Sequence, residues 1–163
     1  MANPEVTRLT LDIDARAKNL KALHDGLVKH LLAIGGDKDT ALYLISDAEE
    51  YGLERALGVL ADQPAAFGLD AAPGPADTAK LTTALKAIES GTLELDKIIR
   101  QRDHLLAADN PKHPLTFHYL GRLFNFSSAR GEVTYLDNGE KVKMKPVGLS
   151  SREKLLRDRD RDR

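Results

Sequence analysis

The chain has 163 residues, with 24 Lys and Arg against 25 Asp and Glu, so its formal net charge is −1. Cysteine is absent, which excludes a disulfide framework, a zinc finger and a cysteine nucleophile. Charged residues make up 30% of the chain and aromatic residues 5%, a balance that favours long amphipathic helices over a compact β fold. No apolar stretch has the length of a membrane span, and the acidic residues from Glu5 onward do not fit a secretory signal, so we expect a cytoplasmic protein.

The net charge conceals an asymmetry along the chain. Residues 141–163 hold nine basic and four acidic residues, a net charge of +5, so the first 140 residues carry −6. An acidic body with a basic end can contact an acidic partner, nucleic acid or its own body.

The first part of the chain predicts three helices. Residues 4–34 show apolar residues at helical spacing, with Asn3 as the N-cap, Pro4 at the first helical position and Gly35-Gly36 at the end. A second helix is expected over 38–50, capped by Asp37 or Asp39. A third is expected over 53–62, where Pro64 either stops it or opens a further turn.

After a Pro/Gly connector at 68–77, residues 78–108 predict the strongest helix, with a heptad pattern. Thr92 and Arg102 are the polar members of that pattern. Arg102 either fixes helix register as a buried polar group or reaches solvent at the open end. The heptad positions are Leu81, Leu85, Ile88, Thr92, Leu95, Ile99, Arg102 and Leu106.

The last third of the chain changes character. Residues 115–126 hold three of the four Phe and one Tyr, and they suit either a short helix or a strand. Residues 132–145 predict a β-hairpin around Asn138-Gly139. Ser150 and Glu153 form a capping box before an alternating Arg-Asp run.

These elements predict a mainly α fold: an antiparallel three- or four-helix bundle with a small C-terminal β-hairpin and a charged tail. We expect residues 1–112 to form the bundle and 113–149 the aromatic segment with its hairpin. Residues 150–163 are expected to form a charged tail, either helical or disordered.

No catalytic, cofactor-binding or metal-binding residue is predicted, and an enzyme ranks last among the function classes. The chain lacks a nucleophile elbow, a phosphate-binding glycine loop and a dinucleotide-binding turn. Its five histidines do not have the spacing of metal ligands on one helix.

The basic end supplies the candidate partner-binding residues. They can neutralise phosphates, with Tyr135 and Phe126 nearby for base stacking, although the interleaved aspartates equally suit a solubilising end. The candidates are Lys141, Lys143, Lys145, Arg152, Lys154, Arg157, Arg159, Arg161 and Arg163.

Residues 51–68 (YGLERALGVLADQPAAFG) resemble a passage of the BID domains, the delivery-signal modules of type IV secretion effectors and conjugative relaxases. The matching residues are Tyr51, Gly52, Leu57, Leu60, Pro64, Phe67 and Gly68. The resemblance implies an antiparallel helix bundle whose positively charged C-terminal tail belongs to a signal that the secretion machinery reads, with its coupling ATPase as the expected partner.

Two functions follow as expectations. The first is a non-catalytic interaction module of type IV secretion or conjugative transfer, bound through its helical surface and basic tail. The alternative is a nucleic-acid-binding accessory protein of a mobile element, which would use the hairpin lysines. Homodimerisation through the helices could accompany either function.

Overall fold

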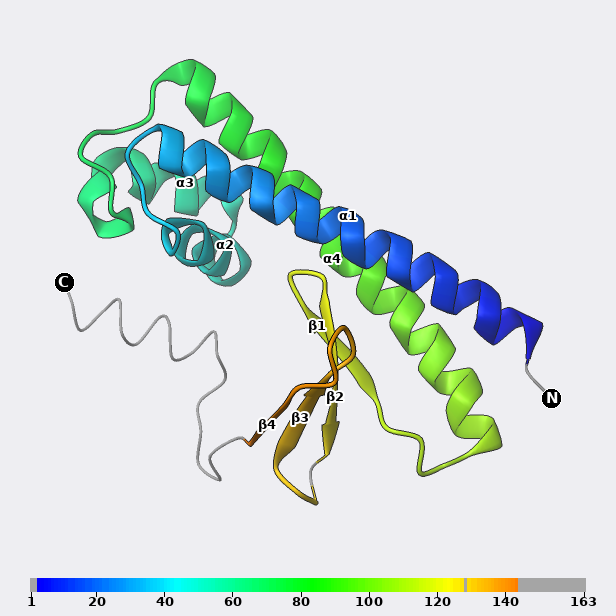
Figure 1. Ribbon diagram of the computed structural model, residues 1–163. Helices are drawn as coiled ribbons and strands as arrows, with labels where there is room; N and C mark the ends of the chain where they lie inside the picture. The colour runs from blue at the N-terminus through cyan, green and yellow to red at the C-terminus, as the bar shows by residue number, and fades with distance from the viewer. Residues whose placement is uncertain (1–2, 128, 144–163) are drawn as a thin grey trace. The chain divides into compact units, whose positions relative to one another are not determined.

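The computed structural model describes residues 3–127 and 129–143 (Figure 1). Within those ranges the chain forms four α-helices, one short 3-10 helix and a four-stranded antiparallel sheet. The mainly α class with a small C-terminal β element is therefore confirmed. The expected tail, residues 150–163, lies outside the described residues.

The described residues divide into two compact units. Residues 23–89 form one unit, and residues 3–22 with 90–143 form the other, which we call the sheet unit. Helices α1 (Pro4–Ala33) and α4 (Pro75–Asp109) each contribute one part to each unit.

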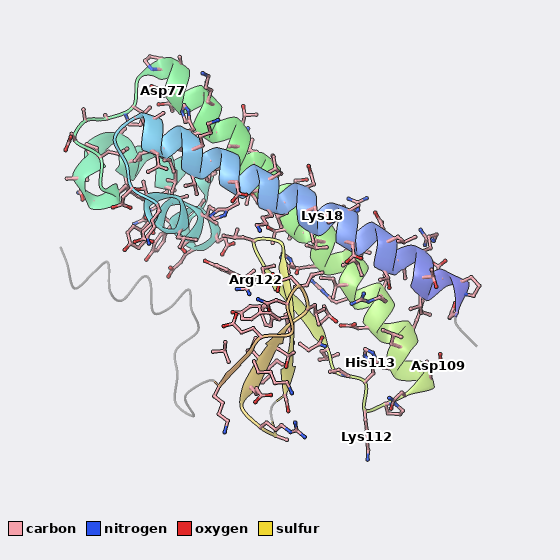
Figure 2. All side chains as sticks on the ribbon, in the orientation of Figure 1. Lys18, Asp77, Asp109, Lys112, His113 and Arg122 are labelled. Carbon is pink, nitrogen blue, oxygen red and sulfur yellow. The ribbon has the colours of Figure 1, made fainter. Side chains whose placement is uncertain are left out.

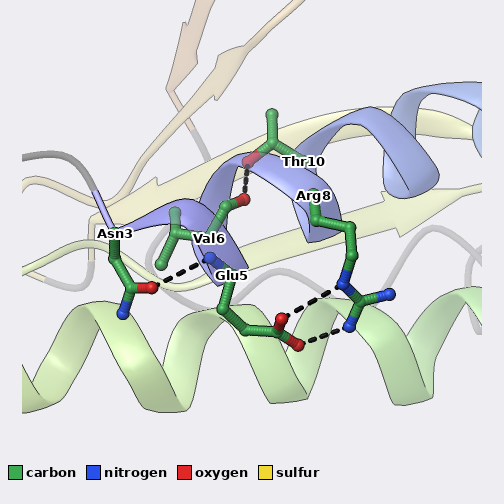
Figure 3. Close-up of polar contacts among 5 residues, drawn as sticks. All are labelled: Asn3, Glu5, Val6, Arg8 and Thr10. Carbon is green, nitrogen blue, oxygen red and sulfur yellow. Dashed lines mark hydrogen bonds and ion pairs between the residues drawn. The ribbon is translucent and has the colours of Figure 1, made fainter.

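Helix α1 begins and ends where its sequence predicts. The Asn3 side-chain oxygen accepts the Glu5 backbone N–H at 2.9 Å, which confirms Asn3 as the cap (Figure 3). In the same first turns Glu5 pairs with Arg8, and the Thr10 hydroxyl donates to the Val6 carbonyl. At the far end Gly35 takes a positive φ of 99°. The N–H of the next residue returns to the Leu31 carbonyl at 2.8 Å, the hydrogen bond of a Schellman-type end.

The unit of residues 23–89 is built from short helices. Helix α2 (Thr40–Tyr51) is followed by α3 (Leu53–Asp62) and the 3-10 helix η1 (Pro64–Phe67), so Pro64 does open a further turn. Asp37 caps α2, because its Oδ1 accepts the backbone N–H of Thr40 at 3.1 Å. Asp39 makes no capping hydrogen bond with its side chain. The core of this unit consists of Leu27, Leu31, Ala41, Leu44, Ile45, Ala56, Leu60, Phe67, Leu69, Leu81, Leu85 and Ile88.

In the sheet unit, α1 and α4 pack side by side through apolar side chains (Figure 1). Gly91 of α4 faces Leu20 of α1 so closely that an added Cβ would lie 3.3 Å from the leucine side chain. Arg102 is buried, which excludes the alternative in which it reaches solvent. The buried residues of the two helices in this unit are the apolar Leu9, Ile13, Ala17, Leu20, Leu95, Ile98 and Ile99 and the charged Arg102 and Asp103.

The sheet is an antiparallel meander in the order β1-β2-β3-β4. The aromatic run forms β1 (Thr116–Tyr119) and β2 (Arg122–Ser127), so of the two expected alternatives the strand is correct. The predicted hairpin is β3 (Glu132–Tyr135) and β4 (Lys141–Lys143). Its connecting loop is longer than a two-residue turn, and Gly139 within it takes a φ of +71°.

The turn between β1 and β2 has two residues, Leu120 and Gly121, both with positive φ, as in a type I′ hairpin turn. Gly121 rests directly on α1, because an added Cβ would lie only 2.3 Å from the Ala17 carbonyl oxygen. A glycine is therefore required there both by the backbone conformation and by the close approach of two backbones.

Replacing Gly121 with Ala should destabilise the protein more than replacing Gly139 with Ala. Both glycines have positive φ, which costs an alanine about 1–2 kcal/mol. Only the first substitution also forces a Cβ into a backbone carbonyl, which adds about 1–3 kcal/mol. Urea unfolding followed by circular dichroism measures both changes, and equal losses would contradict the close approach.

Candidate functional site

Most aromatic residues of the chain lie on one face of the sheet. Side chains alternate between the two faces along a strand, and the register pairs Phe117 with Phe124 and Phe124 with Tyr135, so these rings share a face. Five of the eight Phe and Tyr residues belong to it. We call this surface the aromatic face; it consists of Phe117, Tyr119, Arg122, Phe124, Phe126, Val133, Tyr135 and Val142.

The rings of the aromatic face form a continuous series across three strands. Phe117 stacks on Phe124 with centroids 5.8 Å apart, and Phe124 meets Tyr135 edge-on at 6.0 Å. Phe117 and Tyr119 are each 43% exposed, and Phe126 is 39% exposed. Exposed rings gathered on one face of a sheet make this surface a candidate binding site.

Arg122 completes the series. Its guanidinium carbon lies 3.6 Å from the centroid of the Tyr135 ring, within cation–π distance. The side chain is held by Asp137 at 3.2 Å and by Glu140 at 3.6 Å. Desolvation works against its charge, but the hydrogen bond and charge of Asp137 outweigh it and raise the pKa of Arg122. The guanidinium is thus positively charged and lies over the Tyr135 ring.

The opposite face of the sheet carries the polar residues that attach β1 to helix α4. The Thr116 backbone N–H donates to Asp103 at 2.9 Å, and the Thr116 hydroxyl accepts from Arg102 at 3.0 Å. Arg102 also reaches the Thr10 hydroxyl of α1 at 3.4 Å. All three residues of this Thr116 clamp, namely Arg102, Asp103 and Thr116, are buried.

His118 makes a second attachment on that face. Its side chain is 2% exposed, and its Nε2 lies 2.9 Å from an Asp96 carboxylate oxygen of α4. On its other side the Gly121 backbone N–H donates to His118 Nδ1 at 3.4 Å, so the ring lies between the β1–β2 turn and α4.

Two predicted partner-binding residues, Lys141 and Lys143, fall within the described residues. Both are exposed on β4, but the register places them opposite Thr134 and Glu132, on the face away from the rings. Lys141 lies 3.9 Å from the Glu132 carboxylate. Tyr135 and Phe126, by contrast, both belong to the aromatic face. The other seven candidates, Lys145, Arg152, Lys154, Arg157, Arg159, Arg161 and Arg163, lie outside the described residues.

Sequence reasoning named Phe126 and Tyr135 and missed the other six members of this surface, namely Phe117, Tyr119, Arg122, Phe124, Val133 and Val142. The period-2 alternation in Thr116–Tyr119 was the available signal, because a strand there must put Phe117 and Tyr119 on one face.

In the ranges 3–127 and 129–143, no group of three or more His, Asp or Glu residues is close enough to hold a metal ion. None of the helices in the same ranges is long and apolar enough to cross a membrane. No protein-family model, curated protein or solved structure matches the chain.

The Thr116 clamp predicts a clear difference between two substitutions. Thr116→Val preserves the shape but leaves a buried Arg102 N–H without its acceptor, which should cost about 1–3 kcal/mol of unfolding free energy. Thr116→Ser keeps the hydroxyl and should cost less than about 1 kcal/mol. Urea unfolding at neutral pH compares them, and a valine variant as stable as the serine variant would refute the clamp.

Proposed function

We propose that the chain is a non-catalytic module that binds single-stranded nucleic acid on the aromatic face, as an accessory protein of a mobile element. The observation that carries this proposal is the series of ring contacts from the exposed Phe117 through the half-buried Phe124 to the half-buried Tyr135, with a cation over the last ring. Every nucleobase has a flat apolar face, so aromatic side chains stack on successive bases whatever their sequence, at about 1–3 kcal/mol per base.

The charge distribution supports the same ligand. The acidic first 140 residues are followed by a segment of charge +5 that starts with Lys141 of β4, the strand next to β3 of the aromatic face. A basic segment that follows the sheet in the chain would neutralise phosphates and make binding steeply dependent on salt, although its two described lysines, Lys141 and Lys143, lie on the face away from the rings.

Substitutions of Phe117 test whether a base stacks there. Phe117→Ala should weaken the binding of a fluorescein-labelled dodecathymidylate by about 5- to 100-fold, the equivalent of one lost stacking contact. Phe117→Leu should lose nearly as much, because leucine is apolar but has no planar ring. Fluorescence anisotropy at fixed salt measures the affinities, and circular dichroism checks the fold.

Leu93→Ala is the matched control, since Leu93 is an exposed apolar residue of α4 and does not belong to the aromatic face. It should leave the affinity unchanged. A Phe117→Leu variant that binds as well as the unchanged protein would point to ordinary apolar docking, and a protein that does not bind the oligonucleotide at all would end the proposal.

A second candidate function is a recognition module of type IV secretion, with the helices as an antiparallel bundle and the coupling ATPase as partner. It rests on the resemblance of residues 51–68 to the BID domains, and three residues of that passage occupy special positions in the fold. Gly52 takes a φ of +95° ahead of α3, Phe67 is fully buried, and Gly68 adopts the left-handed conformation after η1.

Deleting residues 150–163 tests this second candidate. If the basic end belongs to a delivery signal, the shortened chain should lose recruitment to the coupling ATPase in a pull-down while keeping its helical circular dichroism spectrum. Recruitment that is unchanged by the deletion would exclude the tail as a signal.

A further inference from the structure

One cleft of the sheet unit collects basic side chains from segments that are far apart in sequence. It has a volume of about 350 Å³ and lies between α1 and the end of the sheet that carries the β1–β2 turn. Lys18 and Lys21 of α1 line it together with Arg122 of β2, and Figure 2 labels Lys18 and Arg122. Its apolar lining comes from Ala17, Leu123 and Leu136.

The two lysines differ from Arg122 in their electrostatic surroundings. Arg122 is already held by Asp137 and Glu140. No ion pair within residues 3–127 and 129–143 involves Lys18 or Lys21. Asp14 and Asp137 also line the cleft, so its three basic and two acidic side chains leave it with a charge of +1. Lys18 and Lys21 stand at i and i+3 of one helix and outnumber Asp14, the one acidic lining residue that is not paired with Arg122, so they favour an anion at this position.

The cleft is fixed by a backbone contact. Gly121 lines it and rests against the Ala17 carbonyl, where no side chain larger than glycine's would fit. The spacing between the α1 backbone that carries the lysines and the β1–β2 turn is therefore set by two packed backbones.

Arg122 joins the cleft to the aromatic face. It lines the cleft, and its guanidinium lies over the Tyr135 ring. We propose that Lys18 and Lys21 bind a backbone phosphate of the single strand whose bases stack on the aromatic face, an inference that rests on the function proposed above. The cleft would hold the sugar-phosphate side of a nucleotide while the rings hold its base.

Salt dependence separates the two contacts. The full chain is titrated into fluorescein-labelled dodecathymidylate at several salt concentrations, and anisotropy gives the affinity at each. The double variant Lys18→Gln/Lys21→Gln should bind roughly tenfold more weakly at low salt, and its slope of log affinity against log salt should be shallower by about 0.7–1.4. Phe117→Ala should lower the affinity without changing the slope, because a stacked ring releases no counterion.

The matched control is Lys80→Gln/Lys86→Gln, which removes the same charge from exposed positions of α4 in the other unit and should leave the slope unchanged. If the Lys18/Lys21 variant has the slope and affinity of the control while Phe117→Ala still weakens binding, the cleft proposal fails and the stacking proposal stands.

Two further outcomes are decisive. If the unchanged protein does not bind the oligonucleotide, both proposals fail together. If a labelled oligoglutamate peptide binds in a way that depends on Lys18 and Lys21 whereas the oligonucleotide does not, the cleft serves an acidic peptide and the nucleic-acid assignment is overturned.

Discussion

The position of the sheet depends on two hydrogen bonds between helix α4 and a single threonine of β1, Thr116. Arg102 and Asp103 are consecutive residues of α4, and they bind the hydroxyl and the backbone N–H of Thr116 respectively. Both charged side chains are buried, where an unpaired charge costs several kcal/mol. A one-residue shift of β1 would replace Thr116 with Leu115 or Phe117 and deprive Arg102 of its hydroxyl acceptor, so the position of β1 is strongly constrained.

That constraint turns the aromatic rings outward. Thr116 and His118 both contact α4, so they lie on the face of the sheet that packs against this helix. Because side chains alternate along a strand, Phe117 and Tyr119 must lie on the opposite face. The strand register pairs Phe124 with Phe117 and Tyr135 with Phe124, so these two rings lie on the same face. A one-sided antiparallel sheet normally buries its apolar residues and exposes its polar ones. At β1 the arrangement is reversed, because the polar Thr116 is buried and the aromatic Phe117 and Tyr119 are exposed. This reversal is the physical reason to propose a binding role for the aromatic face.

Local signals explain which parts of the fold the sequence predicts. The bounds of α1 follow from the Asn3 cap and the glycines after it, and Asn138-Gly139 marks the β3–β4 hairpin. The β1–β2 turn was missed because Leu120-Gly121 is not a usual turn pair. Its conformation makes sense only beside Ala17, a contact between residues about a hundred positions apart. The cleft is hidden for the same reason, since Lys18 and Lys21 look like any solvated helix face until β2 is placed against them.

The placement of charge around the aromatic face also argues for a polyanion. A stacked single strand presents its bases to one side and its phosphates to the border of the stack, so the cations that bind it belong beside the rings rather than among them. In the sheet unit the lysines of the cleft lie near the β1–β2 turn, whereas Lys143 of β4 lies on the face away from the rings. Because the first 140 residues carry a net charge of −6, most of the body repels a phosphate backbone. A nucleic acid would therefore be directed to the cleft where Lys18 and Lys21 lie beside Arg122, the residue that joins the cleft to the rings, and a neutral or basic protein partner would gain less from that arrangement.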